Sequence, residues 1–205
     1  MAQTTDGVRS LLSFPAAHRL FQALAGAPRA RRVLADEYIR ARAGEKVLDI
    51  GCGTADILGY LPEVDYVGFD QNESYIRAAR ETFGARGRFV GRDVNEVAPG
   101  SLGSFDAVLA LGILHHLEDP EAMKLFEIAK SCLKHGGRLI TFDSCYQEGQ
   151  SPAARFFIDR DRGRNTRTEA GYARLASGVF GTVRTAVRHD LLNIPYTHVV
   201  LVCTP

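Results

Sequence analysis

The chain has 205 residues, a formal net charge of +1, 45% hydrophobic residues and 24% charged residues. This length favours one domain, and the near-neutral charge excludes the strong basic field typical of proteins that bind nucleic acid or anionic membranes. No apolar run of about 18 residues and no signal-peptide pattern occurs, so a cytoplasmic location is the default expectation. None of the four cysteines forms a C-x-x-C pair, so we expect no metal site.

The N-terminal third begins with two expected helices. Residues 14–25 (FPAAHRLFQALA) have apolar side chains at helical spacing, which predicts a short amphipathic helix. A second helix is expected over residues 28–42, and Gly44 would end it.

The most informative segment is residues 47–60, VLDIGCGTADILGY. Its apolar start predicts a buried strand, and Gly51 and Gly53 then predict a tight turn in which a ligand can approach the backbone. Thr54 is a candidate N-cap for a helix that carries Ile57, Leu58 and Leu61 on one face.

The acidic residues around this turn indicate the charge of its ligand. A dinucleotide-binding fingerprint requires a third small residue where this chain has Asp56. Asp49 places a second carboxylate immediately before the turn. Two carboxylates suit a ligand with an ammonium or sulfonium group better than one with a pyrophosphate.

The rest of the chain alternates between expected strands and helices. Strands are predicted at residues 65–70, 88–90, 105–111 and 138–142, and helices at 75–83 and at 119–133, the latter capped by Asp119. A further helix over 168–177 precedes two strands, 181–192 and 197–203, joined by a short turn. The pattern predicts an α/β fold with a doubly wound, mostly parallel seven-stranded sheet and a C-terminal antiparallel hairpin.

Ligands of such sheets bind at the carboxyl ends of the strands. Five residues are expected at these ends, namely Asp49, Asp70, Asp93, Leu111 and Asp143. Four of the five are acidic, which fits a cationic ligand.

Several segments together resemble class I S-adenosylmethionine-dependent methyltransferases. These are VLDIGCGT, YVGFDQNE, GRDV, FDAVLALGILHHLED and LKHGGRLITFD, which follow one another in the family's order. The LHHL segment looks closest to the small-molecule branch that includes ubiquinone- and menaquinone-biosynthesis methyltransferases. The N/D-P-P-Y/F pattern of enzymes that methylate exocyclic base nitrogens is absent.

The resemblance implies a Rossmann-like enzyme that transfers a methyl group from S-adenosyl-L-methionine to an O, N or C atom of a small molecule and releases S-adenosyl-L-homocysteine. It implies no nucleic-acid partner, no membrane insertion and a monomer or homodimer. Residues 1–205 would form one domain, with residues 1–26 as a helical lid and the connector 145–167 as a cap over the acceptor.

The resemblance also assigns cofactor contacts. The turn would admit the methionyl and ribose parts, Asp49 would orient the ammonium group and Asp70 would hold the ribose hydroxyls. Adenine would meet Gln71 and the Asp93–Val94 pair, and the backbone at Leu111 would meet the ammonium group. The expected cofactor-binding residues are Asp49, Gly51, Cys52, Gly53, Asp70, Gln71, Asp93, Val94 and Leu111.

Methyl transfer is an in-line displacement that depends mainly on alignment, and a base is needed only when the acceptor must lose a proton. The candidates for a catalytic role are His115, His116, Asp143 and Tyr146. Adjacent histidines cannot both reach one acceptor atom, and each histidine also fits a purely structural role.

Three other functions remain compatible with the sequence. The chain could bind adenosylmethionine as a non-catalytic regulator or partner subunit, because the cofactor residues would be the same. It could use the adenosyl ligand for another reaction. An NAD-dependent oxidoreductase is the third alternative, although Asp56 and the terminal hairpin disfavour it.

Overall fold

The computed structural model describes residues 26–96, 102–161 and 163–205. The helix expected over residues 14–25, and with it nearly all of the expected lid, lies outside these residues. No helix in the described ranges has the length and apolar character needed to span a membrane.

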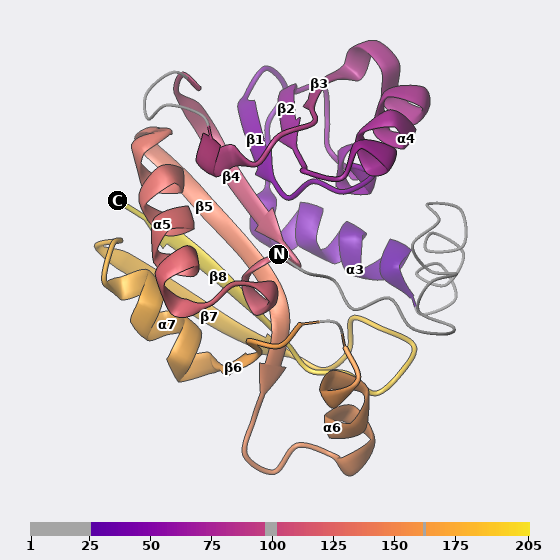
Figure 1. The fold of residues 1–205 in the computed structure, drawn as a ribbon, viewed down its shortest axis with the longest axis vertical. Coiled ribbons are helices and arrows are strands. Elements are labelled where there is room, and N and C mark those ends of the chain that lie inside the picture. Colours follow the sequence, from indigo (N-terminus) through magenta and orange to yellow (C-terminus); the bar gives the residue numbers. More distant parts are fainter. Residues whose placement is uncertain (1–25, 97–101, 162) are drawn as a thin grey trace.

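A single mixed β-sheet forms the centre of the molecule, with strand order β3-β2-β1-β4-β5-β8-β7 (Figure 1). The strands β1 to β5 run parallel to one another, whereas β8 is antiparallel to both β5 and β7. The short β6 pairs with the end of β5 outside this order. The strands are β1 (Lys46–Ile50), β2 (Asp65–Phe69), β3 (Gly87–Val90), β4 (Phe105–Leu111), β5 (Leu133–Tyr146), β6 (Arg167–Thr168), β7 (Thr182–Arg188) and β8 (His198–Thr204). The predicted doubly wound sheet with its terminal hairpin is therefore confirmed.

Helices cover both faces of the sheet (Figure 1). The α-helices are α3 (Ala27–Val33), α4 (Glu73–Phe83), α5 (Asp119–Ser131), α6 (Pro152–Asp159) and α7 (Glu169–Ser177). A π-helical segment, η1 (Leu34–Ile39), continues α3. Short 3-10 turns are η2 (Asp56–Tyr60), η3 (Gly84–Arg86), η4 (Val94–Glu96) and η5 (Leu114–His116).

The alternation of side chains along each strand produces two apolar cores. On one face, Leu48 and Val108 pack with Phe126 of α5 and Tyr172 of α7. On the other face, Val47 packs with residues from η1, η2 and α4. Because both faces are covered, the central strands are apolar on both sides, as expected for parallel strands.

The helix expected after the glycine turn is not formed. The five-residue 3-10 turn η2 replaces it, and the residue before η2 is Ala55, which has a left-handed backbone (φ 55°) and no side-chain cap. Thr54 is therefore not the N-cap of a helix. Pro62 explains the short length, because a proline disfavours helical geometry in the preceding residue, and Leu61 is extended.

Several element boundaries also differ from the prediction. The first described helical segment ends at Ile39, because Arg40 adopts a left-handed conformation (φ 49°) before Gly44 is reached. The cap of α5 is Glu118, which forms a reciprocal capping box with Glu121, so Asp119 lies inside the helix. Strand β5 continues beyond Asp143 to Tyr146, because β8 and then β6 pair with its final residues.

Candidate active site

The glycine turn joins β1 to η2 and is fixed to the end of the neighbouring strand. The backbone N–H groups of Gly51 and Cys52 donate to the Phe69 carbonyl at 2.8 and 2.9 Å. Gly51 (φ 75°) and Gly53 (φ 54°) both have left-handed backbones, which glycine adopts most easily. A Cβ atom on Gly51 would lie 2.6 Å from Cδ1 of Ile113, whereas the space beside Gly53 is open. The turn therefore exposes its backbone at the carboxyl edge of the sheet.

Asp70 follows β2 and is held in place by two backbone donors. Its Oδ2 accepts from the Gly53 N–H at 2.9 Å, and its Oδ1 accepts from the Asn72 N–H at 2.8 Å. Burial raises the pKa of Asp70, and the two backbone hydrogen bonds oppose that rise. Each oxygen retains a second lone pair, so the carboxylate can still accept hydrogen bonds from a ligand hydroxyl.

A pocket opens beside this turn and combines a polar rim with an apolar wall. Five of the residues expected to contact a cofactor line it, namely Gly51, Asp70, Gln71, Asp93 and Val94. The remaining lining residues are Ile50, Phe69, Arg92, Ile113, Leu117 and Leu125. The chain thus brings two carboxylates and several apolar side chains together at the carboxyl ends of β1, β2 and β3.

Most of the apolar residues that line the pocket could not be recognised from the sequence, for an identifiable reason. Leu125 lies on α5 and Ile113 lies after β4, so both read as ordinary core residues from local periodicity. Arg92 also lines the pocket. The sequence could have indicated this through one signal, namely that Arg92 directly precedes Asp93 in a short loop.

Asp49 lies outside the lining and is buried under the turn, 2% exposed. The Tyr66 hydroxyl donates to its Oδ2 at 2.6 Å, and no described residue donates to its buried Oδ1. Burial raises the pKa of Asp49 to about 7, and the Asp70 charge adds to this, whereas the Tyr66 hydrogen bond opposes it. An unpartnered carboxylate oxygen at this position can accept from a cation or from a water molecule.

The other three expected cofactor residues, Gly53, Cys52 and Leu111, are not among the residues that line the pocket. The sulfur of Cys52 occupies the space beside Gly68, where an added Cβ would lie 2.7 Å away. Burial raises the pKa of the Cys52 thiol well above its usual value, so the thiol is not a reactive nucleophile. Leu111 is the last residue of β4 and packs against the core on the η1 and η2 face.

Two of the four candidate catalytic residues form a pair. Strands β4 and β5 are neighbours, with Leu111 opposite Phe142, so the turn η5 after β4 meets Asp143 on β5. The Nδ1 atom of His115 lies 2.8 Å from Asp143 Oδ1, and the His115 backbone N–H donates to the same oxygen at 3.2 Å. Asp143 is 1% exposed and His115 is 7% exposed.

The electrostatics of this pair favour a charged or strongly polarised imidazole. Burial lowers the pKa of His115, but the hydrogen bond to Asp143 and the charges of Asp143 and Asp161 outweigh it, so the pKa lies above the usual value. Burial also raises the pKa of Asp143, against the opposing contact with His115. Because an ionised carboxylate only accepts hydrogen bonds, the Asp143 contact places the proton of a neutral His115 on Nδ1 and leaves Nε2 as the unprotonated nitrogen.

The remaining two candidates make other contacts, one against the His115 ring and one with α6. The His116 ring is tilted against the His115 ring, with centroids 4.1 Å apart. The Tyr146 hydroxyl donates to Asp159 Oδ1 on α6 at 2.8 Å, and its ring lies under the Arg155 guanidinium. Tyr146 therefore belongs to the contact between β5 and α6, whereas Asp143 is the candidate whose carboxylate contacts the His115 ring nitrogen.

The connector between β5 and α7 covers His115. The Asn165 N–H donates to the His115 carbonyl at 2.9 Å, and an added Cβ on Gly163 would lie 2.0 Å from His115 Cδ2. Arg167, which sequence reasoning did not select, donates to the carbonyls of Leu114 and Leu117 at 3.0 and 2.7 Å. These contacts fix the turn η5 from the side opposite the sheet.

Comparison with known proteins identifies this arrangement. Residues 47–137 match the family model described as a methyltransferase domain. Over this segment the chain is similar to class I S-adenosylmethionine-dependent methyltransferases. The matched range begins at β1 and includes the glycine turn, the pocket and the turn that carries His115. It ends before Asp143.

Two relatives of this methyltransferase domain illustrate the range of similar proteins. The ubiquinone biosynthesis O-methyltransferase of Xanthomonas axonopodis pv. citri is 32% identical over 111 residues, which cover 50% of this chain and 46% of that protein. The tRNA U34 carboxymethyltransferase of Geobacter sp. is 34% identical over 116 residues, covering 50% of this chain and 33% of that protein. The chain therefore spans less than half the length of these relatives.

Solved structures of other proteins share this fold. The pyocyanin biosynthetic protein PhzM superposes with a TM-score of 0.74 at 18% identity, covering 97% of this chain and 62% of that chain. At 18% identity, this similarity shows a shared fold alone.

The hydrogen-bonding groups at this pocket match the groups that an adenosylmethionine molecule presents. The open space beside Gly53, the carboxylates of Asp70 and Asp93 and the unpartnered Oδ1 of Asp49 suit a ligand with ribose hydroxyls, an amino-bearing ring and an ammonium group. A dinucleotide would also carry a pyrophosphate, which carboxylates close to the glycine turn would repel.

Proposed function

We propose that this chain transfers the methyl group of S-adenosylmethionine to a hydroxyl oxygen of a small-molecule acceptor. The observation that carries the proposal is the buried His115–Asp143 pair, which lies at the same edge of the sheet as the cofactor pocket. A histidine–carboxylate pair suits an acceptor that must lose a proton, which an alcohol or phenol must do.

The bound cofactor would supply a methyl group on a sulfonium sulfur, which is already an activated leaving group. In our proposal, Asp70 accepts hydrogen bonds from the ribose hydroxyls while Asp93 and Val94 contact the adenine edge. The apolar wall, including Phe69, Leu117 and Leu125, excludes water from the ring. These contacts align the reacting atoms, and alignment can contribute about 7–11 kcal/mol to catalysis.

The pair would act on the acceptor. Asp143 accepts from Nδ1–H of His115, which fixes the imidazole tautomer and leaves Nε2 to receive the acceptor proton. The cofactor would supply the methyl group to the acceptor oxygen and leave as S-adenosylhomocysteine, while Nε2 of His115 would take the proton that this oxygen loses. The resulting imidazolium is stabilised by the Asp143 carboxylate, and its proton later passes to solvent.

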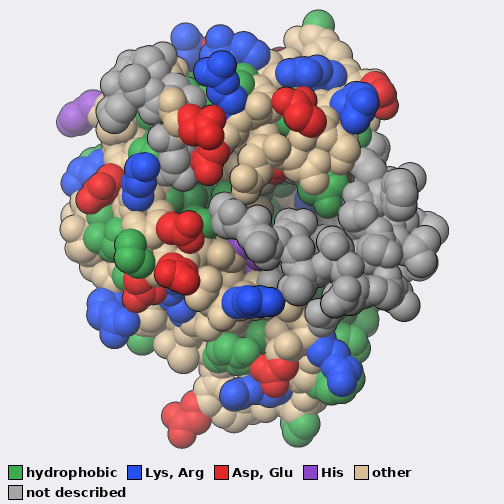
Figure 2. Space-filling model, viewed as in Figure 1, with side chains coloured by type: hydrophobic (Ala, Val, Ile, Leu, Met, Phe, Trp, Pro, Cys, Tyr) green, Lys and Arg blue, Asp and Glu red, His purple; other side chains and the backbone are tan. Residues whose placement is uncertain are grey.

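The surface supports a small molecule rather than a polynucleotide as the acceptor. Figure 2 shows Lys and Arg side chains interspersed with Asp and Glu side chains on the visible face, and the net charge of the chain is +1. A polynucleotide site is typically a continuous basic groove with aromatic side chains. The connector over His115, which we propose acts as a cap, also suits a small acceptor.

A tRNA acceptor is the second candidate, because the relatives include tRNA methyltransferases and a tRNA U34 carboxymethyltransferase. A carboxylate acceptor in tRNA would need no base, since it is already ionised. In that case His115 would have a structural role.

The experiment that separates these proposals follows transfer of a labelled methyl group from adenosylmethionine to two acceptor sets. One set contains phenols, catechols and alcohols, and the other contains total tRNA with and without wobble carboxymethyluridine. Labelled small-molecule product that is lost in the His115→Gln variant supports the proposal. Label in tRNA alone overturns it, and cofactor binding with no transfer to any acceptor favours the non-catalytic role.

A further inference from the structure

A second cleft lies between α3 and η2, apart from the cofactor pocket. Its volume is about 340 Å³, and its lining residues are Pro28, Arg29, Arg32, Val33 and Tyr60. None of these residues lines the cofactor pocket. The volume lies within the range of small-molecule sites, about 300–1,000 Å³.

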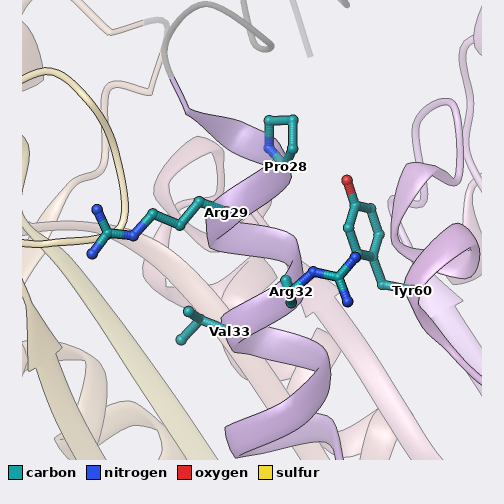
Figure 3. Close-up of a pocket in the computed structure, with 5 residues that line it drawn as sticks. All are labelled: Pro28, Arg29, Arg32, Val33 and Tyr60. Carbon is teal, nitrogen blue, oxygen red and sulfur yellow. The ribbon is translucent and has the colours of Figure 1, made fainter.

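The cleft is positively charged because its guanidinium groups are weakly paired. Arg32 forms no ion pair with any described carboxylate, although Asp36 follows one turn later on the same helical segment. Its guanidinium carbon lies 5.5 Å from the centre of the Tyr60 ring. Figure 3 shows Arg32 turned toward Tyr60, whereas Arg29 extends to the opposite side of α3. Arg29 meets Asp190 at 3.8 Å, and both side chains are more than half exposed, 59% and 51%.

The chemistry of the lining defines the ligand. A guanidinium group recognises carboxylates and phosphates through two parallel N–H donors, and it also stacks on flat rings. Tyr60 adds a phenol ring and a hydroxyl group, while Pro28 and Val33 add apolar surface between the charged groups. Arg29 extends to the other side of α3, so Arg32 and Tyr60 are the residues that face each other across this part of the cleft.

We propose that this cleft binds a small molecule in which a carboxylate or a phosphate is attached to an aromatic ring, with Arg32 as the residue that recognises the anion. This site is distinct from the adenosyl pocket and does not depend on the proposed methyl transfer. Arg31, the neighbour of Arg32, pairs with Asp56 of η2 at 2.9 Å, so the cleft connects to the segment that follows the glycine turn.

The test uses two anionic probes, benzoate and phenyl phosphate, with benzamide as the neutral match of benzoate. Each is titrated into the full chain, with and without saturating S-adenosylhomocysteine, and binding is followed by ligand-observed NMR. We expect one of the two anions, but not benzamide, to bind in both conditions. The anion that binds more tightly identifies the carboxylate or the phosphate as the preferred group.

Variants locate the binding site. Arg32→Gln should weaken binding of the preferred anion at least tenfold, and Arg32→Lys should weaken it less because the charge remains. Tyr60→Leu should weaken it by a smaller factor. Arg174→Gln, an exposed arginine on α7 at the opposite face of the sheet, is the matched control and should leave the affinity unchanged. Thermal unfolding of each variant confirms that it folds.

Three results would overturn the proposal. They are absence of binding by both anions, equal binding of benzamide and benzoate, and binding that S-adenosylhomocysteine displaces but Arg32→Gln does not alter. The last result would place the probe in the cofactor pocket.

Discussion

Nδ1 of His115 lies 2.8 Å from Oδ1 of Asp143, and both side chains are buried at the carboxyl edge of the sheet. The contact joins a turn after β4 to the neighbouring strand β5, so the sheet itself sets its geometry. The pair is the feature that favours an acceptor with an ionisable hydroxyl.

We predict that His115→Gln lowers kcat about a hundredfold or more, because a general base typically contributes that much. The Kd for S-adenosylhomocysteine should stay within about twofold, since His115 does not line the cofactor pocket. His135→Gln is the matched control, because His135 is exposed at the start of β5. Equal losses in both variants, or an unchanged kcat in His115→Gln, would remove the base from the mechanism.

The same pair predicts the pH dependence of the reaction. His115 must be neutral to accept a proton, and its pKa lies above the usual value because of the Asp143 and Asp161 contacts, which outweigh burial. We therefore expect kcat/KM to rise with pH through a pKa above about 6.5. In Asp143→Asn the pKa of His115 should fall and the rising limb should move to lower pH. A rising limb that stays at the same pH in this variant would mean that another group titrates.

The raised pKa of Asp49 leads to a prediction of how cofactor affinity depends on pH. Its pKa in the folded chain is about 7, above the usual carboxyl value, so the neutral form predominates below pH 7. A charged Asp49 attracts the cofactor's ammonium group, so the affinity should increase as the pH rises from 6 to 8. Calorimetric titrations of Asp49→Asn should show a weaker and flatter profile, whereas Asp65→Asn, an exposed control, should keep the original one.

The same raised pKa has a consequence for stability, and its sign follows from proton linkage. The folded state holds the Asp49 proton between about pH 4 and 7, whereas the unfolded chain has released it. The contribution of Asp49 is therefore most favourable at low pH and is lost as the pH rises through about 7. Asp49→Asn should remove this loss, which urea unfolding at pH 5 and pH 8 would measure.

A substitution at Gly163 would test whether activity requires the contact between the connector and His115. A Cβ at this position would lie 2.0 Å from His115 Cδ2 and 2.8 Å from its carbonyl oxygen, so Gly163→Ala forces the connector away. We expect a destabilisation of about 1–3 kcal/mol, typical of overpacking, and a reduced kcat. Gly59→Ala, where an added Cβ makes ordinary contacts, serves as the control. Wild-type activity and stability in Gly163→Ala would show that the connector contact is dispensable.

The sequence predicted the sheet well because its signals are local and repeated. Apolar runs such as residues 105–111 correspond to buried central strands, and the polar residues that follow them appear at one edge of the sheet. Asp70 and Asp93 reach the pocket for this reason alone. Their detailed roles remain predictions.

Other features depend on contacts that no local pattern contains. The missing helix after the glycine turn reflects the left-handed Ala55 and the effect of Pro62 on Leu61. The His115–Asp143 contact requires the neighbouring positions of β4 and β5, so both residues were identified as candidates without being paired. The structural role of Arg167 could not be predicted, because its partners are two backbone carbonyls and Asp119, which lies 48 residues earlier in the chain.

The central claim is that the pocket beside Asp70 binds adenosylmethionine, and one titration tests it most directly. Calorimetry of the full chain with S-adenosylmethionine and S-adenosylhomocysteine should give micromolar binding, about −8 kcal/mol, with at least a tenfold loss in Asp70→Ala. Asp65→Ala is the matched control and should bind as the wild type does. Failure of both ligands to bind the folded chain, or equal affinity in Asp70→Ala, would contradict the account.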